Sequence, residues 1–182
     1  MEYVYLTIEG SIPQLEVGVI KSKDSSHSHV WFLKQNREVK VLSQNLIGFH
    51  IDQTGDNFPH KVCDRCFRYL KTDDFENNRH KKGGMITKRP SCRTCRKVKN
   101  GKSISAEDKR AWAAKRPQNG TVFVCPICKK ISIVGITQID LDHCHKTGRV
   151  RGYVCGSCNT GLGRFDDDPR IIQHAIDWLS TK

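Results

Sequence analysis

The sequence is poor in the residues that build a large hydrophobic core. Hydrophobic residues make up 37% of its 182 residues and aromatic residues only 8%, whereas globular chains are typically about 45–50% apolar when glycine is counted. No apolar run approaches the ~18 residues of a membrane-spanning helix, and acidic residues are outnumbered by basic ones, 19 to 31. A single large core, a membrane span and an acidic-tail protein are therefore excluded, and stability needs another source.

The N-terminal segment also lacks a secretory signal. Residues 1–5, Met-Glu-Tyr-Val-Tyr, show no basic region followed by an apolar stretch. We therefore expect the chain to stay in the reducing cytoplasm, with no membrane partner. Its formal net charge of +12 predicts a polyanionic partner, and 18 of the 31 basic residues but only 7 of the 19 acidic ones lie between residues 56 and 120.

Nine cysteines form four Cys-x-x-Cys pairs and one single residue, Cys144. Disulfides are rare in a reducing compartment, whereas two thiolates spaced in this way on a tight turn bind one tetrahedral zinc ion. Redox-active or scattered cysteine pairs are the alternative. The similar gaps within the two halves, 25 and 26 residues, favour two structural zinc sites, formed by Cys63, Cys66, Cys92 and Cys95 and by Cys125, Cys128, Cys155 and Cys158.

These features predict an α+β chain of small zinc-stapled modules. Residues 1–55 contain five short β-branched or aromatic-rich runs, mostly bounded by turn residues, which predict a small antiparallel barrel or curled sheet. This domain either faces DNA, forms a dimer or simply completes the fold. The five runs are residues 4–8, 17–20, 29–33, 38–42 and 46–51.

The second predicted module, residues 56–120, is the basic one. It contains the first cysteine set, a turn at Gly83-Gly84 and a helix after Ser105, a residue suited to cap it. We expect this module to contact the DNA phosphate backbone; a merely solvated basic face is the alternative. Among the basic residues between its cysteine pairs are Lys71, Arg79, Lys81, Lys82, Lys88 and Arg89, with His80 beside them.

The third module, residues 121–182, carries the chemistry. After Cys125-Pro126-Ile127-Cys128 it reads Asp142-His143-Cys144-His145, Thr147-Gly148, Val150-Arg151-Gly152 and, from Cys155, Cys-Gly-Ser-Cys-Asn. Together these motifs, from Cys125 to Leu179, resemble the ββα-metal (HNH) nucleases of the recombination endonuclease VII-like branch. The sequence departs from that pattern at Cys144, where an acidic residue often stands.

The residue types make chemical sense of this resemblance. Asp142 and Asn159 supply a carboxylate and an amide oxygen, the hard donors that suit Mg²⁺, and a strand-end bulge would turn Asp142 and His143 towards one cleft. His143 is then the general base, since imidazole is largely neutral near pH 7. His145 either contacts the scissile phosphate, as the resemblance implies, or supports the hairpin. The alternative is a third zinc site made from His143, Cys144 and His145.

The resemblance implies a Mg²⁺-dependent endonuclease that cuts double-stranded DNA and leaves 5′-phosphate ends. The whole-chain layout, with extra modules before the nuclease, resembles ββα-metal type II restriction endonucleases. The alternatives are a structure-selective resolvase of Holliday junctions and branched DNA, and a non-catalytic zinc-ribbon nucleic-acid-binding protein. Because one Asp142-His143-Asn159 set cuts one strand, we expect a homodimer on a palindromic site. Its interface would use the β domain or a C-terminal helix capped by Asp168.

Overall fold

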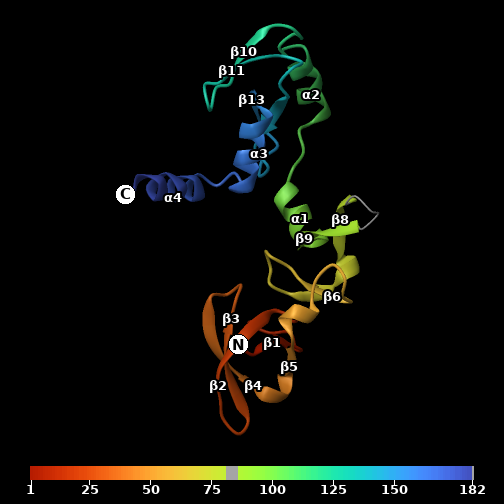
Figure 1. The fold of residues 1–182 in the computed structure, drawn as a ribbon, viewed down its shortest axis with the longest axis vertical. Helices are drawn as coiled ribbons and strands as arrows, with labels where there is room; N and C mark the ends of the chain where they lie inside the picture. The colour runs from red at the N-terminus through yellow and green to blue at the C-terminus, as the bar shows by residue number, and fades with distance from the viewer. Residues whose placement is uncertain (81–85, 182) are drawn as a thin grey trace. The chain divides into compact units, whose positions relative to one another are not determined.

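A computed structural model describes residues 1–80 and 86–181, and these form two compact units, Met1–Lys97 and Val98–Lys182 (Figure 1). Each unit combines antiparallel strands with short helices, which confirms the α+β class. The predicted Gly83-Gly84 turn and two of the basic residues, Lys81 and Lys82, lie outside the described residues. The division at residues 55 and 120 rests on charge and stays a prediction.

All five predicted N-terminal strands are present in one antiparallel sheet of order β4-β3-β2-β1-β5. Alternation along β1 and β3 buries Val4, Leu6, Val30 and Phe32 on one side. Side chains from both edge strands, β4 and β5, pack against this cluster, so the sheet curls around a small core. The strands are β1 (Tyr3–Leu6), β2 (Val17–Lys23), β3 (His27–Phe32), β4 (Arg37–Leu42) and β5 (Leu46–Phe49).

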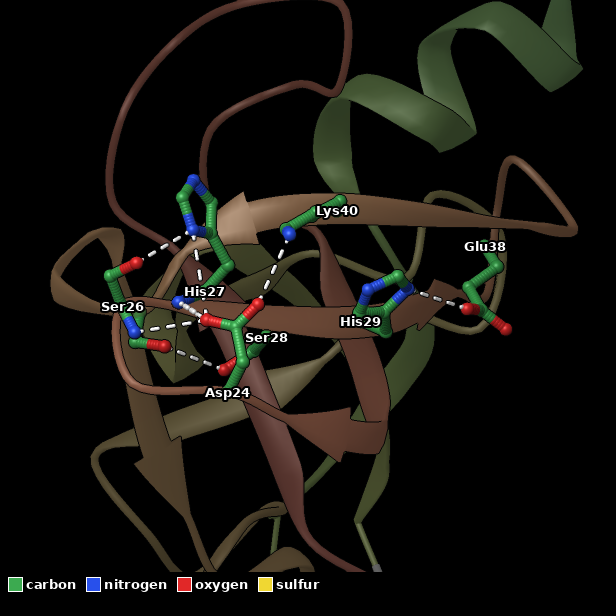
Figure 2. Close-up of polar contacts among 8 residues, drawn as sticks. Asp24, Ser26, His27, Ser28, His29, Glu38 and Lys40 are labelled. Atoms are coloured by element: carbon green, nitrogen blue, oxygen red, sulfur yellow. Dashed lines mark hydrogen bonds and ion pairs between the residues drawn. The ribbon is translucent and has the colours of Figure 1, made fainter.

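Charged side chains brace the exposed turn between β2 and β3, as Figure 2 shows. Asp24 accepts hydrogen bonds from the backbone N–H groups of Ser26 at 3.0 Å and His27 at 2.7 Å, and pairs with Lys40 at 3.0 Å. These donors hold the pKa of the Asp24 carboxyl well below its ordinary value. Polar contacts of Asp24 thus hold the β2–β3 turn in place.

The first four-cysteine segment packs against this sheet within the same unit. Val17 donates its N–H to the Phe67 carbonyl and Tyr69 donates to the Leu15 carbonyl, both at 2.8 Å, and the Tyr5 and Tyr69 rings stack with centroids 4.7 Å apart. Its elements are β6 (His60–Val62), β7 (Tyr69–Lys71), β8 (Phe75–His80), β9 (Ile86–Cys92) and α1 (Arg93–Asn100). Short 3₁₀ turns, η1 (Ser43–Asn45), η2 (Ile51–Gln53) and η3 (Thr72–Asp74), join elements of this unit.

The second unit holds two hairpins and three helices. Ser105 caps α2 by accepting from the Asp108 N–H, and Asp168 caps α4 by accepting from the Arg170 N–H, as predicted. Cys158 lies in the first turn of α3, which begins at Gly156. The elements are α2 (Ala106–Ala113), β10 (Val122–Val124), β11 (Ile131–Ile133), β12 (Ile139–His143), β13 (Val150–Cys155), α3 (Gly156–Arg164) and α4 (Pro169–Ser180).

Packing in the second unit is uneven. Tyr153 on β13 donates its hydroxyl to the Trp112 carbonyl at 2.8 Å, which ties α2 to the hairpin. In contrast, α4 leaves Ile176, Trp178 and Leu179 exposed, with Trp178 and Leu179 at 79% and 78%. The apolar face of α4 is therefore not covered by the rest of the unit. Within the described residues, no helix has the length and apolar character needed to cross a membrane.

Candidate active site and metal centres

Both predicted cysteine sets come together as tight clusters. Within each set all four Sγ atoms lie within 4.8 Å of one another, and Cys128 and Cys155 Sγ are 3.8 Å apart. That spacing suits four sulfurs around one ion at about 2.3 Å. The sets are Cys63, Cys66, Cys92 and Cys95, and Cys125, Cys128, Cys155 and Cys158.

Thiol ionisation shows why these clusters suit a cation. Burial, together with hydrogen bonds among the neighbouring thiols, raises the pKa of Cys95 to about 11 and that of Cys158 to about 12. Four thiolates so close together repel one another, so they cannot all be ionised at neutral pH unless a cation compensates their charge. Each set can therefore hold one metal ion, because its four sulfur donors can share the charge of a single cation.

The β12–β13 hairpin contains a bulge at the predicted strand end. Asp142 pairs with Gly152, but the next residue, His143, pairs with Val150, so Arg151 is the extra residue of the ladder. Gly152 has φ +137°, a backbone region that side chains with a Cβ rarely adopt. The bulge breaks the strict alternation of the ladder at the point where Asp142 and His143 adjoin.

Arg151 uses this position to bind the backbone and two carboxylates. Its Nε lies 3.3 Å from Asp142 Oδ2, and its Nη2 lies 2.9 Å from Asp167 Oδ2 and 2.8 Å from the His143 carbonyl. The Asp142 side chain is only 8% exposed, so this pair operates where water competes weakly. Sequence reasoning missed Arg151 as a partner of these carboxylates and missed Asp167 altogether, because only the bulge and the α3–α4 connection bring these residues together.

The two histidines of the motif lie side by side. The His143 and His145 rings have centroids 4.8 Å apart and meet edge to face, and His145 Nδ1 lies 3.5 Å from Asp167 Oδ2. The turn that carries them is held from outside, because Lys102 donates its N–H to the His145 carbonyl at 2.8 Å. At Gly101, with φ +57°, a Cβ would lie 2.1 Å from that carbonyl oxygen, so only glycine fits.

Cys144 serves the turn and joins no metal cluster. Its carbonyl accepts from the Gly148 N–H at 2.7 Å, and a hydrogen bond from the Thr147 hydroxyl lowers the pKa of its thiol. In residues 1–80 and 86–181, the two four-cysteine sets alone bring three or more histidine, cysteine or carboxylate ligand atoms together. The alternative third zinc site at His143, Cys144 and His145 is therefore not assembled.

Asn159 lies in the first turn of α3, and its nearest polar partner is a residue that sequence reasoning missed. Its Nδ2 donates to Asp140 Oδ2 at 3.2 Å. Asp140 and Asp142 are two residues apart on β12, so both side chains project from one face of the strand, about 6.6–6.8 Å apart along it. This i, i+2 spacing was the available signal for Asp140. Asp142 and Asn159 offer the oxygen donors that a hard divalent cation prefers.

Comparisons with known proteins agree with this geometry. The family model of recombination endonuclease VII matches residues 101–181, and that of the His-Me finger endonuclease beta4-alpha2 domain matches residues 50–101. The crystal structure of the ββα-Me type II restriction endonuclease Hpy99I superposes with a TM-score of 0.90 and 38% identity, covering 98% of this chain and 96% of that one. Gene 59 protein of Mycobacterium phage D29 is 36% identical over 77 residues, which span 42% of this chain and 43% of that protein.

Proposed function

This chain belongs to the ββα-metal, or His-Me finger, nucleases, and we propose that it is a type II restriction endonuclease that cuts double-stranded DNA at a palindromic site. The observation that carries the proposal is the placement of Asp142, His143 and Asn159 on one hairpin and the helix after it. The match to a restriction enzyme over 98% of the chain includes the N-terminal sheet and the basic segment. This coverage favours a restriction enzyme over a branched-DNA resolvase, and the catalytic residue types favour a nuclease over a non-catalytic binder.

We assign different metals to the two kinds of site. The cysteine sets take zinc, because four soft thiolates at tetrahedral spacing suit that ion. Asp142 and Asn159 would hold Mg²⁺ through hard oxygen atoms. When bound there, this ion would neutralise a phosphate oxygen and the developing charge on the leaving 3′ oxygen. Thiolate ligands also fit the reducing cytoplasm, where we expect the protein to work.

His143 is assigned as the general base. Its ring takes a proton from a water molecule whose oxygen forms a bond to phosphorus while the bond from phosphorus to the 3′ oxygen breaks. That 3′ oxygen takes a proton from solvent, so the products are a 5′-phosphate and a 3′-hydroxyl. We assign His145, whose Nδ1 lies near Asp167 and whose ring lies edge to face with that of His143, to contact the scissile phosphate. Arg151 holds the Asp142 carboxylate and the His143 carbonyl.

We further assign a homodimer as the working unit. One chain carries one Asp142-His143-Asn159 set, which cuts one strand, so both strands of a duplex need two sets. A two-fold dimer supplies them with the same symmetry as a palindromic site. Two surfaces are candidates for the contact: the N-terminal sheet, and the exposed apolar face of α4 with Trp178 and Leu179.

The direct test is digestion of a plasmid of known sequence by the zinc-loaded protein with Mg²⁺, followed by sequencing of the ends, with EDTA as the control. We expect 5′-phosphate ends at one short palindrome and two chains per duplex by light scattering. Cleavage confined to cruciform DNA would favour the resolvase, and binding without cleavage the zinc-ribbon binder. One chain per duplex, with nicked circles before linear product, would contradict the dimer.

A further inference from the structure

A side-chain amide presents two groups of nearly equal shape and opposite polarity. The oxygen of Asn159 can bind a cation, whereas its NH₂ group carries partial positive charge and repels one. Rotation of the amide by half a turn exchanges the two groups at almost no steric cost. An asparagine that holds a metal ion therefore needs a neighbour that selects between the two orientations.

Asp140 is such a neighbour. An ionised carboxylate only accepts hydrogen bonds, so the amide group that faces it must be the NH₂, and Nδ2 of Asn159 lies 3.2 Å from Asp140 Oδ2. The reversed amide would set the Asn159 oxygen against a carboxylate oxygen and lose the bond. Within the described part of the chain, Asn159 Oδ1 accepts no hydrogen bond, so the amide oxygen is left available on the side turned away from Asp140.

Asp140 is itself held in place on both oxygens. Gln138 Nε2 donates to Asp140 Oδ1 at 2.8 Å, while Asn159 occupies Oδ2. The start of α3 closes over the carboxylate: a Cβ at Gly156 would lie 3.4 Å from Asp140 Oδ2, and the Gly156 N–H donates to the Gln138 carbonyl at 2.9 Å.

The two oxygens of the Asp142 carboxylate also differ, since in the part of the chain that the structure describes a protein group binds only one of them. Arg151 Nε engages Asp142 Oδ2 at 3.3 Å, and in the described residues Oδ1 has no hydrogen-bond partner. Asp142 projects from the same face of β12 as Asp140, one i, i+2 step further along. Both proposed ligands are thus fixed through the atom that the cation does not use.

We propose that Asp140 is a positioning residue, which orients the Asn159 amide so that Oδ1, and not Nδ2, faces the cation shared with Asp142. The inference rests on the proposed function, because it specifies how Asn159 becomes a ligand there. Partners of metal ligands typically change metal affinity or activity by 10- to 100-fold when they are removed. The role of Asp140 is one of orientation, and it depends on Asn159 being an amide.

The test compares Asp140→Ala in two backgrounds, wild type and Asn159→Asp. A carboxylate at position 159 offers an oxygen in either rotamer and has no need of Asp140. We expect Asp140→Ala to weaken binding of Mn²⁺, measured by EPR titration of the zinc-loaded full chain, by about 10-fold or more when residue 159 is Asn. It should cause no loss when residue 159 is Asp, and the Mg²⁺ concentration for half-maximal cleavage should follow the same pattern.

Zinc content and melting temperature verify that each variant folds, and the nearly isosteric Asp140→Asn provides a second probe with a smaller expected loss. Equal losses in both backgrounds, or no loss in either, would overturn the positioning role alone. Unchanged Mn²⁺ affinity in Asn159→Ala would instead contradict the proposed role of Asn159 as a ligand, and this inference with it.

Discussion

The two four-cysteine segments are built from the same elements in the same order. Each begins with a hairpin that carries the first cysteine pair, β6–β7 and β10–β11, and continues with a second hairpin, β8–β9 and β12–β13. The last residue of the second hairpin is the third cysteine, Cys92 or Cys155, and the helix that follows carries the fourth, Cys95 or Cys158. The metal cluster thus joins two hairpins and a helix in both.

The two segments also share the position of one polar contact, but they make this contact with different residue types. The residue after the fourth cysteine contacts the second residue of the first strand of the second hairpin in both segments. In the first segment this contact is an ion pair, with Arg96 Nε 2.7 Å from Glu76 Oε2; in the second it is the 3.2 Å bond from Asn159 to Asp140. An arginine presents only donors, whereas an amide keeps an oxygen free. The corresponding positions of the two segments therefore differ: the first presents a paired cation, and the second presents an amide whose oxygen is not used by this contact.

The first strands of the two second hairpins, β12 and β8, also carry different residues towards their ends. Two and three positions after the residues of this contact, β12 carries Asp142 and His143, while β8 carries Asn78 and Arg79. The two four-cysteine segments thus share a scaffold and differ in the side chains placed on it; under the proposed function, those of the second segment serve catalysis and those of the first contact phosphate.

The largest expected effect comes from breaking either metal cluster. Cys63→Ser and Cys125→Ser should each remove about one zinc ion per chain and unfold the segment concerned, because zinc-finger peptides gain about 10–16 kcal/mol on binding metal. This binding free energy is as large as the whole free energy of unfolding of a typical domain, ~5–15 kcal/mol. Elemental analysis and calorimetry measure both effects. Cys144→Ser, outside both sets, is the matched control and should keep both ions; loss of both ions in either single variant would show that the clusters are not separate.

Next in size are the catalytic substitutions. Asp142→Ala, His143→Ala and Asn159→Ala should each lower single-turnover cleavage by at least about 10²–10⁴-fold, the range for loss of a general base, and leave DNA binding nearly intact. Arg96→Ala, at the position equivalent to Asn159, should change the cleavage rate at saturating protein by less than about 3-fold, since no chemistry is assigned to that segment. Full activity in the His143 variant would remove it as the base.

A smaller effect is expected at Arg151. Arg151→Ala releases Asp142 and Asp167 together and should lower cleavage about 10- to 100-fold, as for other partners of metal ligands. Arg151→Lys retains the charge but not the forked geometry, so it should recover only part of the rate. Arg149→Ala on the same hairpin is the control, because its side chain is exposed. Equal rates for the Arg151→Ala and Arg149→Ala proteins would contradict a positioning role for Arg151.

The smallest effect concerns the basic segment. Lys97 is exposed on α1, and Lys97→Ala should reduce the slope of log affinity against log salt by about 0.9, the value for one phosphate contact. Fluorescence anisotropy with EDTA present, between ~50 and ~200 mM salt, measures this without cleavage. Lys21→Ala, on the N-terminal sheet whose region carries little net charge, is the control. An unchanged slope for Lys97→Ala would assign that residue to a solvated face.

Much of the fold could be predicted because its signals are local in the sequence. Short alternating runs mark the five N-terminal strands, cysteine spacing marks both metal clusters, and Ser105 and Asp168 mark the helix starts that they cap. Each of these depends on residues within a few positions of one another, or on thiolates whose chemistry allows few partners. The surroundings of α4 have no such local signal: an apolar stripe states that a face can be buried, but not what covers it, and Trp178 and Leu179 are exposed in the structure.

The amino-acid order alone specifies which side chains are available: two sets of four cysteines, an Asp-His pair at a strand end, an asparagine directly after a Cys-x-x-Cys pair and an excess of basic charge. How these side chains are oriented depends on the packing of hairpin and helix. The bulge at Arg151 gives Asp142 an arginine partner, and the closure of α3 over β12 sets Asp140 against the amide of Asn159. Composition and spacing are properties of the chain, but the choice between two faces of an amide, or two oxygens of a carboxylate, depends on contacts that form only after hairpin and helix pack together.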